Sequence, residues 1–142
     1  MIEVVNRQRR LKLDAEKWSE LAARVLKKLN VAGAAGVTVA FVSDRAMREL
    51  NRRWRGKRGT TDVLSFPLEQ EAWEQGEGQT LGDVIVSVER AARQAKENGL
   101  TLDEEIAQLI LHGLLHLCGY DHGTDTGEMN ALELRLRRQL GI

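Results

Sequence analysis

The sequence is poor in several features, and each shortage excludes a class of protein. It holds one cysteine, Cys118, which rules out an internal disulfide and fits a reducing cytoplasm. No apolar run has the length of a membrane span, and the first residues carry charge where a signal peptide would be apolar. The formal net charge is zero, so the overall balance does not by itself predict a nucleic-acid partner. We expect a cytoplasmic protein with neither a membrane nor a disulfide partner.

What is present is typical of a globular protein. Apolar residues make up 42% of the chain and charged residues 30%. A chain of 142 residues can bury about two-thirds of its unfolded surface in one core. We therefore expect a single domain over residues 1–142, with no internal repeat and no linker.

Strand-like and helix-like patterns alternate along the chain. β-Branched or continuous apolar runs predict short strands at residues 2–5, 37–42, 63–66 and 82–87. Apolar residues spaced three and four apart predict helices at about 15–29, 45–54, 88–98, 101–118 and 128–140, with Trp54 on an inner face. Suitable helix-capping side chains precede or begin these segments, at Asp14, Ser43 or Asp44, Ser87, Thr101, and Asp125 or Glu128.

All three histidines lie in one stretch, which reads HGLLHLCGYDH from His112 to His122. On a helix, the four-residue spacing puts His112 and His116 on one face, one turn apart. Gly119 suits a left-handed helix end, after which the chain can turn back and bring His122 to the same point. Three imidazoles without a fourth protein ligand are typical of a catalytic zinc site, so we predict one metal ion here.

Other interpretations of this stretch are weaker. A single histidine in an apolar helix is usually a hydrogen-bonded core residue, but three within eleven residues favour a metal. Metzincin peptidases share the spacing, yet they carry a catalytic glutamate where this chain has Gly113. A structural zinc site would be closed by four ligands and usually includes cysteine, whereas Cys118 lies about 200° around the helix from His116.

Basic side chains are concentrated between residues 45 and 58, where seven cations accompany one acid, Glu49. This could be an ordinary solvated helix face. The cations continue, however, into the glycine-punctuated loop 55–59, which suits contact with phosphate. Charge alone leaves the two interpretations equally balanced.

Three motifs together resemble the YbeY family: the histidine stretch, TDVLSFP at residues 61–67 and LGDVIVS at residues 81–87. The segment 50–57 matches the same family, whose members are bacterial ribosomal-RNA maturation factors described as metal-dependent, single-strand-specific endoribonucleases. The resemblance implies a zincin-like (metalloprotease-like) α+β fold, in which a small mixed sheet packs with helices around a central histidine-bearing helix. It also implies one zinc ion held by His112, His116 and His122, and an arginine, Arg55, near that metal.

The implied activity is cleavage of single-stranded RNA in small-subunit rRNA maturation and ribosome quality control, with the small ribosomal subunit or a ribosomal protein as partner. We expect Arg55 to stabilise the charge of the phosphodiester transition state. The cations expected to guide the RNA backbone are Arg52, Arg53, Lys57 and Arg58. Asp121 is the candidate to orient a ligand imidazole as an outer-shell acceptor.

Several points stay open. Asp62 and Asp83 either face the same cleft or only begin strands, and no general base is evident from spacing. Trp54 could stack on an unpaired base, although its helical spacing favours core packing. The alternative functions are a non-catalytic ribosome-assembly factor whose zinc fixes the last loop, and a metallopeptidase-like hydrolase. The basic loop disfavours the peptidase, and the open three-ligand site disfavours the assembly factor.

Overall fold

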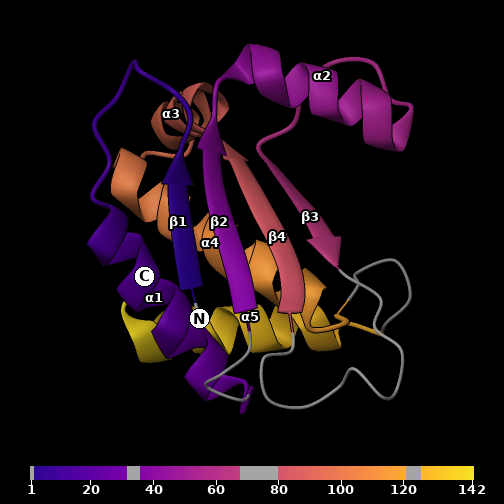
Figure 1. Ribbon diagram of the computed structural model, residues 1–142. Helices are drawn as coiled ribbons and strands as arrows, with labels where there is room; N and C mark the ends of the chain where they lie inside the picture. The colour runs from indigo at the N-terminus through magenta and orange to yellow at the C-terminus, as the bar shows by residue number, and fades with distance from the viewer. Residues whose placement is uncertain (1, 32–35, 68–79, 121–125) are drawn as a thin grey trace.

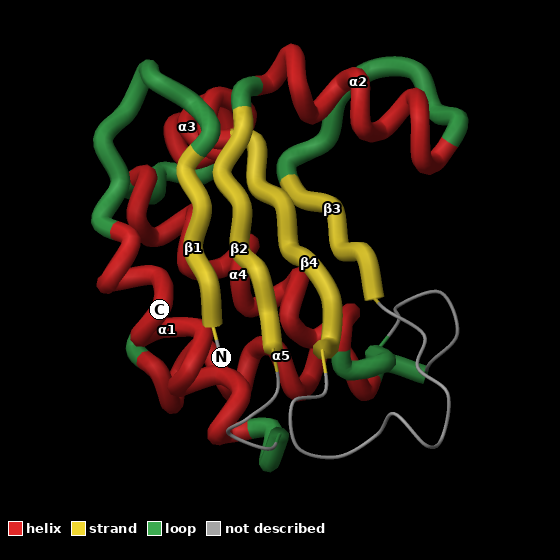
Figure 2. Tube along the Cα trace, viewed as in Figure 1, coloured by secondary structure: helices red, strands yellow, loops and turns green. Residues whose placement is uncertain are grey.

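A mixed four-stranded sheet is the frame of the computed structural model, which describes residues 2–31, 36–67, 80–120 and 126–142 (Figure 1). The strands of this described part are β1 (Ile2–Asn6), β2 (Gly36–Val42), β3 (Val63–Pro67) and β4 (Thr80–Ser87). Their order across the sheet is β1-β2-β4-β3. The first three strands in this order run parallel, and β3 pairs antiparallel with β4, as the arrows in Figure 1 show. Figure 2 shows β3 at the edge of the sheet. The four predicted strands are therefore confirmed, each to within a few residues.

The helices begin where the capping side chains predict. They are α1 (Ala15–Lys28), α2 (Asp44–Arg55), α3 (Val88–Glu97), α4 (Leu102–Leu117) and α5 (Glu128–Leu140). Side-chain oxygens accept from backbone N–H groups at the predicted N-caps Asp14, Ser43, Ser87 and Thr101. The last helix differs, because Gly127 is its N-cap and Glu128 is its first residue, while Asp125 lies outside the described residues. Strands and helices together form a small α+β domain.

The main core lies between one face of the sheet and the helices behind it in Figure 1. Val39 and Phe41 of β2 and Val84 of β4 contribute to it from the sheet and are fully buried. Helix α4 contacts β3, β4, α1, α3 and α5, and ten of its sixteen residues are buried. The histidine-bearing helix is thus the central helix, as predicted. No described helix combines the length and the apolar composition that crossing a bilayer would need.

Helix α2 packs on the other face of the sheet through a second, smaller cluster. Met47 is fully buried there against Val42 and Leu64. No residue after Asn51 in α2 is buried, and Trp54 in its last turn is 67% exposed. The prediction that Trp54 faces the core is therefore wrong. Helical spacing identifies a face of α2, but the surface that covers this face does not reach the last turn.

A candidate active-site cleft

His112 and His116 form a close pair on successive turns of α4. Their ring centroids are 4.7 Å apart, with the planes inclined by 75°. The two Nε2 atoms lie 3.1 Å from each other. The four-residue spacing therefore brings the same ring nitrogen of both residues to one point, as the sequence predicted.

A buried carboxylate contacts the opposite side of the first imidazole. Oε1 of Glu133, on α5, lies 2.8 Å from Nδ1 of His112. When Nδ1 carries the proton and donates a hydrogen bond to this carboxylate, the lone pair of Nε2 points towards His116. Glu133 is not among the residues predicted from the sequence, although the sequence holds a signal for it. Glu133 lies between Met129 and Leu136 on the apolar face of α5, where a carboxylate needs a partner.

The imidazole pair fits a metal ion. Two ligands bound tetrahedrally at zinc–nitrogen distances of about 2.0–2.1 Å would be roughly 3.3 Å apart, close to the observed separation of 3.1 Å. Gly119 has φ 96° and ends α4 in the left-handed region, as expected. His122 and Asp121, the predicted third ligand and its neighbour, lie outside the described residues. Within the described ranges, no group of three potential ligands is assembled.

Gly113 lies where α4 packs tightly against the sheet. A Cβ atom on this residue would lie 2.6 Å from Cγ1 of Val84, which is itself fully buried. The Ser65 hydroxyl donates to the Gly113 carbonyl at 3.1 Å and fixes this approach. A glutamate cannot be accommodated here without a shift of Val84. At the position where metzincin peptidases carry their catalytic base, this chain therefore has a glycine that lets α4 pack on the sheet.

The histidine pair opens onto a cleft of about 780 Å³ between α4, strand β3 and the end of α2. Residues 61–67 line one side, Gly119 and Tyr120 follow from α4, and Trp54 and Arg55 enter from α2. Of the five cations predicted to act on RNA, Arg55 lines this cleft. Asp62 lines it as well, whereas Asp83 does not belong to its described lining.

The other predicted RNA contacts lie away from the histidines. Arg52 is paired with Glu49 at 2.7 Å, and together with Arg58 it lines a separate hollow on α2. Arg53 and Lys57 are exposed at the end of the helix and in the loop that follows. The structure thus places one cation in the cleft and the others on the adjoining surface.

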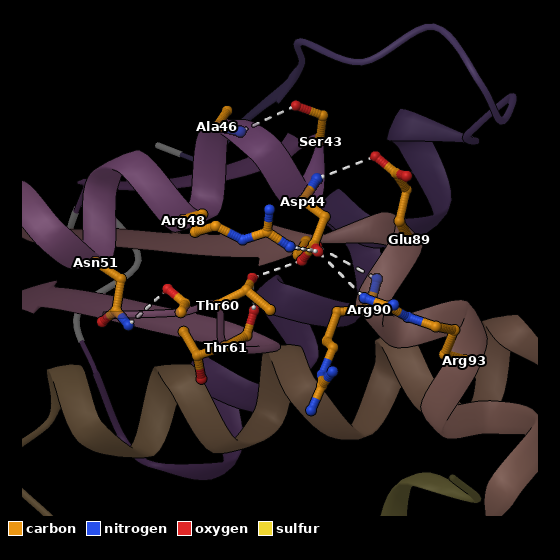
Figure 3. A network of polar contacts seen from close by, with 12 residues as sticks. Ser43, Asp44, Ala46, Arg48, Asn51, Thr60, Thr61, Glu89, Arg90 and Arg93 are labelled. Atoms are coloured by element: carbon orange, nitrogen blue, oxygen red, sulfur yellow. Dashed lines mark hydrogen bonds and ion pairs between the residues drawn. The ribbon is translucent and has the colours of Figure 1, made fainter. Parts of the chain in front are cut away.

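A polar network anchors the start of α2 and the loop after it (Figure 3). Asp44 is buried, and its Oδ1 accepts from the hydroxyls of Thr60 and Ser87 at 2.5 and 3.1 Å. Its Oδ2 accepts from Arg48 and Arg93 at 3.3 and 3.1 Å. Burial alone would raise the pKa of Asp44, but the two hydroxyls and the two guanidinium groups outweigh it and lower the pKa.

The same loop is tied to the body of α2. Asn51 donates from Nδ2 to the carbonyl of Gly59 at 3.3 Å (Figure 3). Gly56 ends the helix in the left-handed conformation, with its N–H donating to the Arg52 carbonyl. Both ends of residues 56–60 are therefore fixed, and with them the position of Arg55 at the edge of the cleft.

Comparison with known proteins agrees with this description. The family model described as "Endoribonuclease YbeY" matches residues 3–141. The endoribonuclease YbeY of Aquifex aeolicus is 47% identical over 107 residues, which cover 75% of this chain and 67% of that protein. Its counterpart in Carboxydothermus hydrogenoformans is 39% identical over 145 residues, covering 100% of this chain and 99% of the relative.

A solved structure is also similar. The solution structure of a Thermotoga maritima protein superposes with a TM-score of 0.65 and 31% identity, over 95% of this chain and 85% of that one. The family model and the sequence identities confirm the family resemblance that the sequence motifs suggested. The chain belongs to the Endoribonuclease YbeY family.

Proposed function

We propose that this protein is a zinc-dependent endoribonuclease that cleaves single-stranded ribosomal RNA in small-subunit maturation and ribosome quality control. One observation carries the proposal: two imidazole Nε2 atoms 3.1 Å apart share a cleft with an arginine, Arg55. Nitrogens that can ligate a metal and a guanidinium that can bind phosphate therefore line the same cleft, which supports the proposal. Relatives that match most of the chain carry the name endoribonuclease YbeY.

The metal would be held by His112 and His116, with His122 as the third ligand and one ion per chain. When bound, a zinc ion supplies Lewis acidity that polarises a phosphoryl oxygen and acidifies water. Glu133 would accept a hydrogen bond from Nδ1–H of His112 and so keep Nε2 turned towards the cleft. The arrangement of a central histidine-bearing helix behind a mixed sheet supports a zincin-like fold.

Arg55 would bind the scissile phosphate and stabilise the negative charge that develops on it. A planar guanidinium suits this because it can donate two parallel hydrogen bonds to a phosphate. Arg52, Arg53, Lys57 and Arg58 would guide the flanking backbone over the adjoining surface of α2. Ribosomal RNA as substrate implies a cytoplasmic protein that meets the small ribosomal subunit or one of its proteins.

Helix packing argues against the peptidase alternative. Gly113 stands at the position of the peptidase base, and Val84 leaves no room there for a side chain. A hydrolase with glycine at this position must activate water without that glutamate. This suits phosphodiester cleavage, in which the negative charge that develops on the phosphate has to be stabilised.

Substitution of one ligand tests the proposal. Wild type, His116→Ala and Leu134→Ala are purified under nuclease-free conditions, the last as a control that removes an exposed side chain of α5 outside the cleft lining. We expect His116→Ala to remain folded but to lose its zinc, and its cleavage rate should fall by more than about a hundredfold. This exceeds the loss of about 10–100-fold that is typical when an outer-shell partner is removed.

Three measurements decide the outcome: zinc content, circular dichroism and cleavage of a labelled single-stranded rRNA fragment. Equal cleavage by all three proteins would identify the activity as contamination. A wild type that binds rRNA and zinc without cutting would instead support the assembly-factor alternative.

A further inference from the structure

Trp54 is a large aromatic side chain that the fold leaves uncovered. It is 67% exposed, more than Leu134 at 47% and Leu11 at 36%, the other exposed large hydrophobic residues of the described chain. Of these three, Trp54 lines the histidine cleft. An indole ring in contact with water at this point is not explained by core packing.

The ring is nevertheless held in place. Phe66 of β3 contacts it edge to face, with ring centroids 6.4 Å apart and planes inclined by 71°. Phe66 is anchored in turn, because it packs on the smaller cluster beneath α2. The indole therefore has a supported orientation while most of its surface remains accessible.

The neighbourhood of Trp54 is cationic. Arg53 and Arg55 flank it in the sequence and are exposed, and Arg55 lines the same cleft. A supported aromatic ring next to exposed guanidinium groups is complementary to a nucleic-acid strand, since bases stack on the ring while phosphates contact the cations.

We propose that Trp54, supported by Phe66, is a stacking subsite for one unpaired base of the RNA strand bound at Arg55. A base in a duplex is covered on both faces by its neighbours, whereas a base in a single strand can rotate onto the indole. The subsite would therefore favour single-stranded over duplex substrates. The inference rests on the proposed function, because it assigns part of the same substrate.

Kinetics with the full-length, zinc-loaded protein separate base contacts from phosphate contacts. The substrate is a single-stranded RNA dodecamer. The competitor is a strand of the same length made of abasic spacers, which keeps the phosphates and lacks every base. We expect Trp54→Ala to raise KM for RNA by between about fivefold and a hundredfold, the range that loss of base–aromatic stacking gives. Both kcat and the Ki of the abasic strand should stay within about twofold of their wild-type values.

Three variants serve as references. Trp54→Phe keeps an aromatic face and should restore most of the affinity for RNA. Leu134→Ala should behave as wild type, and Arg55→Ala should raise the Ki of the abasic strand because it removes a phosphate contact. Circular dichroism melting of Trp54→Ala should match wild type, since little of the side chain is buried.

The results that would overturn the inference are distinct from a failure of the proposed function. An unchanged KM in Trp54→Ala, or a Ki of the abasic strand that rises as much as KM, contradicts stacking while the nuclease proposal stands. A zinc-loaded wild type that neither cuts nor binds single-stranded RNA contradicts both.

Discussion

Two clusters of polar residues, Asp44 with its hydrogen-bond donors and the pair His112 and His116, differ in how far the protein encloses them. Asp44 is 7% exposed, and both its oxygens accept hydrogen bonds from protein donors on α2, α3, β4 and the loop before β3. His112 and His116 are partly exposed, and their Nε2 atoms meet at the wall of an open cleft. The Asp44 carboxylate is thus enclosed by its donors, whereas the histidine nitrogens face the cleft.

The difference separates structural from chemical use of polar side chains. A sealed carboxylate with four donors holds α2, α3 and β4 together and offers nothing to a ligand. Imidazoles oriented from behind by a buried glutamate, and facing a cleft that also holds Arg55, suit binding and catalysis. Substitutions in the first group should therefore change stability, and substitutions in the second should change metal binding or rate.

The largest stability effect is expected from Asp44→Ala. Removing the carboxylate leaves the Thr60 and Ser87 hydroxyls and two guanidinium groups without their acceptor. We expect the free energy of unfolding to fall by about 2–4 kcal/mol, less than for a fully buried ion pair because both arginines are half exposed. Urea unfolding measures the change.

Glu49→Ala is the matched control for Asp44→Ala, because it breaks an exposed ion pair on the same helix. We expect no measurable loss of stability in this control. Zinc content should be that of wild type in both variants. If Asp44→Ala and Glu49→Ala were equally stable, the Asp44 network would contribute no more to the free energy of unfolding than the exposed ion pair does.

A smaller effect, in metal binding, is expected from Glu133→Gln. The substitution keeps the size of the side chain but removes the charge that orients Nδ1 of His112. Outer-shell partners of this kind change metal affinity by about 10–100-fold, and we expect weakening in that range with the fold intact. Competition with a chromophoric chelator measures the zinc Kd. Glu20→Gln on the exposed side of α1 is the control, and equal Kd values for the two variants would refute the role of Glu133.

The smallest effect is a pH dependence of the stability that the Asp44 network contributes. Its hydrogen bonds and arginines keep the pKa of Asp44 lowered in the folded protein despite burial. The stability contributed by the carboxylate is therefore fully present above about pH 4 and is lost as the pH falls through the lower, folded-state pKa. The difference in stability between wild type and Asp44→Asn should be constant from about pH 5 to 7 and shrink in more acidic solution. A difference that grows on acidification would contradict the assignment.

Local chemistry made much of the fold predictable. The caps at Asp14, Ser43, Ser87 and Thr101 each depend on a side chain and an N–H three residues away, so short patterns suffice to find them. The order of the strands depends on pairing between distant segments, and no pattern indicated that β4 lies between β2 and β3. The residues that cover α2 also come from distant segments, and the sequence does not show how far along the helix they reach. For this reason the prediction that Trp54 faces inward was wrong.

The candidate site shows the same division. The pairing of His112 with His116 follows from one helical turn, and it was predicted. Glu133 comes from a different helix, twenty-one residues along the chain, and the sequence gives only the hint of an acid within an apolar face. Arg55 was selected through the family resemblance, and its position in the cleft follows from the anchoring of α2 and its loop.

The central claim is that Arg55 acts on a phosphate beside the imidazoles that we propose as metal ligands. The most direct test is the single-turnover rate at which zinc-loaded wild type and Arg55→Ala, matched in zinc content and thermal stability, cut a single-stranded rRNA fragment. We expect the variant to be slower by about 100- to 1,000-fold, as when one donor to a developing oxyanion is removed. A variant that retains its zinc and cuts at the wild-type rate would contradict the claim.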